Sequence, residues 1–171
     1  MPQVDAAFLT DSQIRGVIKT MVGQVANSGT WLDRWGQIPD WATEVGAAGG
    51  PFWHIRRSGE KCDWPGVAMN DLDGPEAERS ATYQLSLYYP YTLDEDGEEA
   101  NPSEPDYDAL VDAVLAKFED EPNLNGNVFQ ASLLDYTSPG SGFVGIQVGQ
   151  GVMVCHFGQF DIDIRQFRTR A

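Results

Sequence analysis

The residues best suited to metal, redox or acid–base chemistry are two cysteines and two histidines. They are Cys62, Cys155, His54 and His156. Thiolate and imidazole groups are common zinc ligands and can form a nucleophile–base pair. Cys155 and His156, however, are neighbours in a predicted strand, where successive side chains point to opposite faces of the sheet. We therefore predict a buried structural cysteine and a structural or exposed histidine, and we name no catalytic residue and no metal ligand.

A glycine pattern in the C-terminal third resembles a nucleotide-binding loop. Residues 140–145 read Gly-Ser-Gly-Phe-Val-Gly, which matches Gly-x-Gly-x-x-Gly. A dinucleotide site needs this loop to open a helix whose N-terminus faces the pyrophosphate. Residues 143–149 instead alternate like a strand. The glycines therefore predict a hairpin turn, and we expect no cofactor.

The acidic residues fit no complete catalytic or calcium motif. Asp94, Asp96 and Glu98 have alternate spacing, but a calcium loop requires glycine at Glu99 and glutamate at Pro105. Segment 94–105 therefore predicts a solvated acidic loop, although a loose divalent site stays open. Serine catalysis has no Gly-x-Ser-x-Gly elbow to support it. We expect a protein that is not an enzyme, with a small hydrolase using a carboxylate or Cys155 as the alternative.

All five tryptophans fall within 34 residues of a segment rich in glycine and proline. Such a cluster can form a satellite core, a contact between subunits, or a platform for sugars. We rank a satellite core first and a subunit interface second, and a sugar-binding module remains an alternative from another class. The tryptophans are Trp31, Trp35, Trp41, Trp53 and Trp64.

Composition and charge exclude several classes of protein. The chain has 171 residues, of which 42% are hydrophobic, and its net charge is −15. These values predict one domain over residues 1–171 and disfavour free binding to nucleic-acid phosphates. No apolar run is long enough to span a membrane, and residues 1–11 do not resemble an export signal. Two cysteines are too few for a disulfide scaffold, so we expect a reducing compartment.

The charge is concentrated in one stretch. Residues 94–121 hold 12 of the 26 acidic residues and one basic residue, Lys117. The last seven residues carry three arginines, so their net charge is positive and opposite in sign to that of residues 94–121. If subunits form a ring, the acidic loop 94–105 and the arginine-bearing C-terminus are candidate complementary patches.

Periodicity predicts two helices and a set of strands around them. Apolar residues recur at helical steps after Asp11 or Ser12 as the cap, with Gly29 as the stop, and again from Asp106 to Pro122. Alternation predicts strands over 52–57, 83–89, 128–134, 143–148, 152–157 and 160–166, the last two joined with a bend at Gly158. The order predicts an α+β fold, a mainly antiparallel sheet with two amphipathic helices packed on one face.

The whole-chain pattern resembles the tail terminator proteins of long-tailed bacteriophages and the related minor tail or tail-completion proteins. The resemblance rests on the order of four elements: an opening helix with Ile14, Val17 and Ile18, a strand over 83–90, a helix over 107–115 and a closing strand over 160–165. The Trp-rich segment 28–74 is longer than in compact members and is a candidate insertion.

The resemblance implies a mechanical role in the virion tail or neck, after assembly in the host cytoplasm. Subunits would form a ring, typically a hexamer, that caps the tail tube, ends its polymerisation and joins it to the head-side connector protein. DNA would pass through the lumen without specific binding. The alternative within this setting is a head-to-tail connector or stopper. The candidate lumen or subunit residues are Asp94, Glu95, Asp96, Glu98 and Glu99, and the candidate interface residues are Arg165, Arg168, Trp31 and Trp35.

Overall fold

The computed structural model describes residues 8–32, 50–63, 75–91, 103–128, 130–138, 142–148 and 150–169. Within these ranges the predicted α+β class is confirmed, as a mixed six-stranded sheet with two helices. In chain order the elements are α1 (Asp11–Gly23), β1 (Thr30–Leu32), β2 (Phe52–Asp63), β3 (Pro75–Pro90), α3 (Glu104–Asp120), β4 (Gln130–Thr137), β5 (Phe143–Val148) and β6 (Gly151–Thr169).

Strand β6 organises the sheet. The strand order is β1-β2-β3-β6-β4, and β5 also pairs with β6. One side of β6 pairs with β3, and the other side pairs with β5 over its first part and with β4 over its second. These pairings and that of β2 with β3 are antiparallel, whereas β1 runs parallel to β2. The sheet is mixed because of this three-residue strand, which the alternation did not predict.

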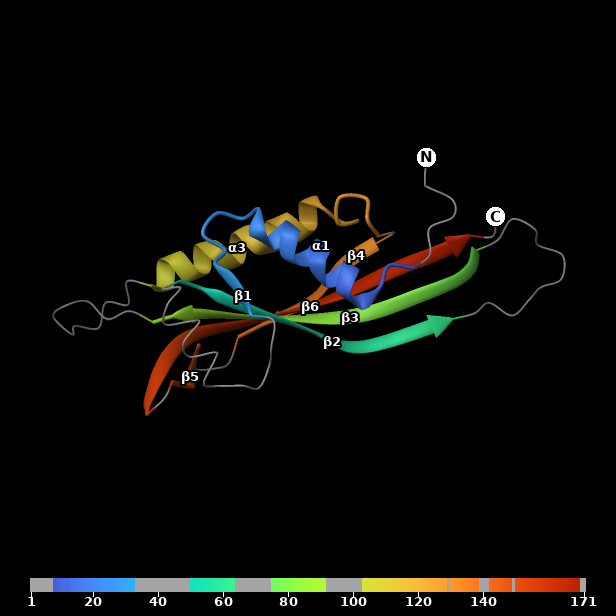
Figure 1. Cartoon of the computed structure of the whole chain (residues 1–171). Helices are drawn as coiled ribbons and strands as arrows, with labels where there is room; N and C mark the ends of the chain where they lie inside the picture. The colour runs from blue at the N-terminus through green and yellow to red at the C-terminus, as the bar shows by residue number, and fades with distance from the viewer. Residues whose placement is uncertain are drawn as a thin grey trace.

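Both helices lie over the same side of the sheet (Figure 1). Their apolar stripes bury Ile14, Ile18, Leu110 and Val114 against one face of β2, β3 and β6. Trp53 is fully buried in this core, where its indole nitrogen donates to the Ser28 carbonyl at 2.5 Å. A smaller cluster includes Leu32, Phe52, Tyr88, Ile146 and Cys155.

The helix boundaries correct the predicted caps. Helix α1 is capped by Thr10, not by Asp11 or Ser12, because Thr10 and Gln13 form a reciprocal capping box. The helix ends at Gly23, well before Gly29. Gly29 has a φ of +86°, and a Cβ there would lie 1.8 Å from the Pro51 carbonyl oxygen, so it permits close backbone approach at the start of β1. Helix α3 ends before Pro122, as predicted.

Several strand boundaries also differ from the predicted ranges. Strands β2 and β3 extend to Asp63 and back to Pro75, and β4 covers 130–137. Strand β6 is continuous through Gly158, as expected. A Cβ at this glycine would lie 2.7 Å from the Tyr107 hydroxyl, so the absence of a side chain allows the tyrosine to pack closely on the strand. The predicted strand over 143–148 is confirmed as β5, with Gly145 inside it. Gly142 precedes this strand with a φ of +73°, and the other residues of the predicted turn, Gly140 and Ser141, lie outside the described residues.

Candidate functional site

Within the described residues, a serine–histidine contact with aromatic neighbours surrounds His156 at the N-terminus of α3. Its Nε2 lies 2.9 Å from the Ser103 hydroxyl, and its ring stacks on Tyr107 with centroids 4.9 Å apart. Phe143 from β5 and Tyr91 pack on the same ring, at 5.0 and 5.7 Å. Burial lowers the pKa of His156, although the nearby carboxylates of α3 oppose the shift. The cluster joins the first turn of α3 to the base of the β5–β6 hairpin.

A serine–histidine contact is the geometry that activates a nucleophile, so we considered a hydrolase site here. Ser103 and His156 are each only 3% exposed. Aromatic rings from Tyr91, Tyr107 and Phe143 pack around the imidazole. The contact therefore serves best as a structural connection between α3 and β6.

Cys155 and His156 lie in different clusters, as strand geometry predicted. Cys155 is fully buried in the cluster with Phe52 and Tyr88, and burial raises its pKa to about 12. A thiol with such a pKa stays protonated at neutral pH and is a poor nucleophile. Among the described residues, no group of three or more His, Cys, Asp or Glu side chains could hold a metal ion. The side chain of Cys62 lies outside the described residues.

The two candidate interface residues whose side chains the structure describes, Trp31 and Arg165, make contacts within their own chain. Trp31 stacks on the buried Trp53 with ring centroids 5.6 Å apart. Arg165 pairs with Asp163, at 3.1 Å between Nε and Oδ2, while its side chain is 49% exposed. The other candidates lie outside the described residues or side chains: Arg168, Trp35, Asp94, Glu95, Asp96, Glu98 and Glu99.

The structure exposes an apolar, uncharged hairpin that the periodicity did not identify as a site. The sequence has no Asp, Glu, Lys or Arg from Tyr136 to Phe160. This stretch contains the β5–β6 hairpin, which bends away from the helices (Figure 1). Phe143, Val152 and Val154 are 38%, 69% and 43% exposed on it. Exposed strands are normally protected by charged residues, so an uncharged hairpin is an unusual surface on so acidic a chain.

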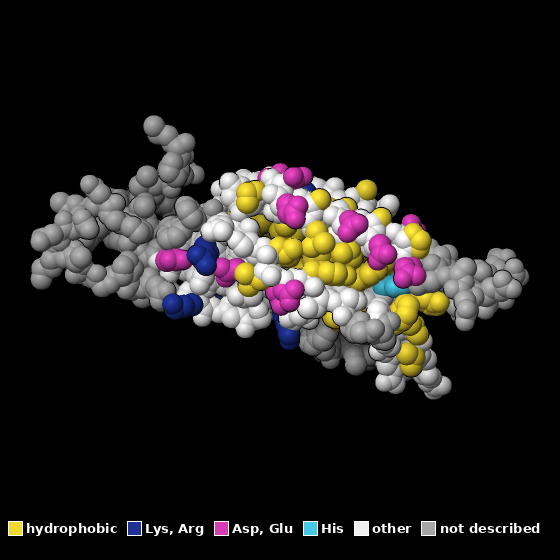
Figure 2. Space-filling model, turned by 180° about the vertical axis from the view of Figure 1, so that it is seen from behind, with side chains coloured by type: hydrophobic (Ala, Val, Ile, Leu, Met, Phe, Trp, Pro, Cys, Tyr) yellow, Lys and Arg dark blue, Asp and Glu magenta, His cyan; other side chains and the backbone are white. Residues whose placement is uncertain are grey.

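The α3–β4 flank of the molecule is acidic. All six acidic residues of α3 are exposed, and the single lysine of the helix, Lys117, pairs with Glu121 at 3.7 Å. Viewed from behind, acidic side chains border a band of apolar atoms on this side (Figure 2). On the edge strand β4, Leu134 is the extra residue of a β-bulge and is 59% exposed, and Asp135 beside it is also exposed.

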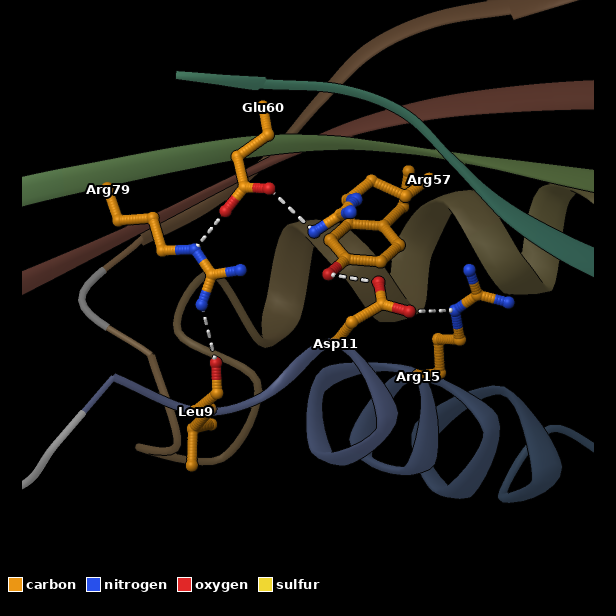
Figure 3. A network of polar contacts seen from close by, with 7 residues as sticks. Leu9, Asp11, Arg15, Arg57, Glu60 and Arg79 are labelled. Atoms are coloured by element: carbon orange, nitrogen blue, oxygen red, sulfur yellow. Dashed lines mark hydrogen bonds and ion pairs between the residues drawn. The ribbon is translucent and has the colours of Figure 1, made fainter. Parts of the chain in front are cut away.

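The opposite flank, formed by α1 and β2, carries most of the described basic residues. An interlocking set of contacts holds α1 on the sheet (Figure 3). Arg15 Nε lies 2.9 Å from Asp11 Oδ2, and the same carboxylate accepts from the Tyr83 hydroxyl at 2.9 Å. Glu60 binds both Arg57 and Arg79, and Arg79 also donates to the Leu9 carbonyl at 3.1 Å.

A groove of about 480 Å³ lies on this basic flank, between α1 and the edge of the sheet. Gly16, Leu32 and Ile55 give it apolar lining. Arg15 and Lys19 add two cationic side chains, and Asp11, which pairs with Arg15, adds a carboxylate. Lys19 Nζ also lies 5.9 Å from the centre of the Trp31 ring. The sequence does not predict the groove, because the groove depends on how α1 packs against the sheet. For the hairpin the sequence does carry a signal, namely the stretch 136–160 without charged residues.

Comparison with known proteins gives no assignment. The chain matches no family model and no curated protein sequence. In the described part of the chain, no helix is long and apolar enough to cross a membrane.

Proposed function

We propose that this protein is a structural assembly protein without enzymatic activity, whose working form is a ring of identical subunits. More particularly, we propose a tail terminator or tail-completion protein of a long-tailed bacteriophage. The ring, a hexamer, caps the tail tube, ends its polymerisation and meets the head-side connector protein, and DNA passes through its lumen. No cofactor takes part in this role.

The observation that carries the proposal is the β5–β6 hairpin. Its exposed valines and its lack of charge suit a protein–protein contact, and apolar residues form the centre of such contacts. Subunits that each carry a net charge of −15 repel one another, so an uncharged surface is where they can approach most easily.

The finer architecture also supports the proposal. The resemblance to tail terminators implies a mainly antiparallel sheet with both helices on one face. An acidic ring lumen would repel DNA phosphates and let the duplex slide through. The proposed residence in the virion tail or neck follows from this role.

The test is the solution mass of the purified protein by light scattering, combined with negative-stain images, with and without millimolar magnesium to reduce carboxylate repulsion. Closed rings that bind the ends of tail tubes are expected. A strict monomer that also fails to bind tail tube ends would overturn the proposal. Binding to a portal or adaptor protein in place of tail tube protein would assign a connector role.

The double variant Val152→Asp/Val154→Asp tests whether the hairpin makes the contact. Both side chains are exposed, so the subunit should fold with unchanged stability while ring formation is lost. The control Asn27→Asp/Ser58→Asp adds the same charge at exposed positions away from the hairpin and should still form rings.

A further inference from the structure

We propose that the β4 bulge at Leu134 and Asp135 of one copy docks into the groove between α1 and the sheet edge of a second copy. This inference rests on the proposed ring and adds a second contact between subunits to the one proposed for the β5–β6 hairpin. The partner is therefore another copy of the same chain, joined head to tail.

The two surfaces lie on opposite flanks of the subunit. Strand β4 is at one end of the main strand order, and β1 and β2 are at the other. Helix α1 contacts the second flank through the Arg15 guanidinium, which donates to the Ile55 carbonyl at 3.3 Å. In a pair of subunits joined through two different surfaces, one surface of each kind is still free. The contact can therefore repeat from copy to copy, and it gives a closed ring where the rotation between copies allows closure.

The chemistry of the two surfaces is complementary. The bulge presents an exposed apolar side chain next to an exposed carboxylate. The groove presents apolar lining from Leu32 and Ile55 next to the ammonium group of Lys19. Its other cation, Arg15, already pairs with the carboxylate of Asp11. Opposite charges placed around an apolar contact give both orientation and register to an interface.

A second observation points to a cationic partner for the bulge. Asp135 lies directly across from Asp161 in the pairing of β4 with β6. Like charges at directly opposite positions in an antiparallel pair are unfavourable. Gln84 Nε2 from β3 donates to Asp161 Oδ1 at 3.1 Å. A lysine or arginine from a neighbouring copy would further offset the negative charge at Asp135.

A charge-swap experiment tests the contact through the dissociation constant of self-association, measured by analytical ultracentrifugation. Asp135→Lys and Lys19→Asp should each raise this constant by about tenfold or more, because each places like charges together. The double variant Asp135→Lys/Lys19→Asp should restore it to within about threefold, since it exchanges the charges and keeps the net charge of the native chain.

Matched controls separate this contact from general repulsion. Glu119→Lys makes the same change in net charge as Asp135→Lys but on α3, and it should strengthen association slightly by reducing the negative charge. Lys117→Asp is the corresponding control for Lys19→Asp. If Asp135→Lys strengthens association as Glu119→Lys does, or if the double variant is no better than the single ones, the proposed contact is wrong.

A crosslinking experiment tests the geometry without relying on charge. The Leu134→Cys and Ser12→Cys proteins are mixed and oxidised. The native chain, oxidised in the same way, measures any crosslinking through Cys62 and Cys155. A covalent dimer should form in the mixture and not in either variant alone, because Ser12 lines the groove. Equal crosslinking in Leu134→Cys alone would show a symmetric contact and overturn the proposal.

The outcomes for the ring and for the contact are distinct. Rings that persist unchanged in all these variants would leave the proposed function standing and remove this contact. A native chain that neither self-associates nor binds tail tube ends would remove both. Variants that form rings normally but no longer bind tail tubes would assign the bulge to the tube protein, which also overturns the proposal.

Discussion

At the scale of single residues, Gly158 shows how a missing side chain permits packing. The Tyr107 and Tyr136 hydroxyls, 2.8 Å apart, meet over this position of β6. Gly158→Ala should therefore lower the free energy of unfolding by about 1–3 kcal/mol, because both rings are held in the core and must shift. Urea unfolding measures this change.

A glycine with open space around it provides the control. Gly16 lies in the middle of α1, and a Cβ there meets nothing within 4 Å. Gly16→Ala should stabilise the protein by up to about 1 kcal/mol through helix propensity. Equal effects of the two substitutions would contradict the close packing at Gly158.

The two buried histidines predict a loss of stability in mild acid. Burial lowers the pKa of both His54 and His156, and Arg15 and Arg56 further lower that of His54. Below the unfolded-state value of about 6.5, the unfolded chain therefore binds protons that the native chain does not. The free energy of unfolding should fall as the pH drops from about 6.5 toward the lowered values, by at most about 1.4 kcal/mol per pH unit for each histidine.

Substitution of each histidine identifies its share of this pH dependence. His156→Gln should reduce the slope of stability against pH between about 6.5 and 5.5, and His54→Gln should remove the other part. The measurement is denaturant unfolding at a series of pH values. An unchanged slope in both variants would show that neither histidine is buried in its neutral form.

At the scale of elements, the cap of α1 determines where the helix begins. Thr10 Oγ1 accepts from the Gln13 amide at 3.2 Å, and Gln13 Oε1 accepts from the Thr10 amide at 2.8 Å. Thr10→Ala should cost about 1 kcal/mol of stability, whereas Thr10→Ser, which keeps the hydroxyl, should cost little. Thermal unfolding distinguishes these outcomes, and equal losses in the two variants would rule out the cap as the cause.

The sequence predicted the elements where periodicity is long and one face is buried. The stripe from Ile14 to Val22 and the alternation around Tyr83 both correspond to elements in the structure. Strand β1 was missed because three residues are too few to show a period. The strand over 143–148 was predicted with its observed bounds, because the alternation of its residues continues through Gly145.

The exposed residues of the candidate site were harder to predict, because the exposure of a side chain depends on how the elements are arranged in space. Val152 and Val154 have the pattern of ordinary strand residues, and they are exposed because the β5–β6 hairpin bends away from the helices (Figure 1). Leu134 reads as a core residue, but the bulge displaces it from the register. Neither result follows from local composition.

At the scale of the whole molecule, charge predicts weak interaction with DNA. With a net charge of −15, the subunit should bind duplex DNA at physiological salt no more tightly than about 10⁻⁴ M. Fluorescence anisotropy of a labelled duplex measures this, with a basic protein as the positive control. Micromolar binding would contradict the proposed sliding of DNA and would direct attention to the basic flank of α1 and β2.

The position of β6 has a consequence for synthesis of the protein. This strand comes last in the described chain, yet it lies between β3 and β4 and also pairs with β5. During translation, β3, β4 and β5 are therefore made before the strand with which they pair. Contacts between residues so distant in sequence form late and slowly. The hairpin and the bulge then take shape only when translation has reached β6, so truncated chains lack both surfaces and do not compete with complete subunits.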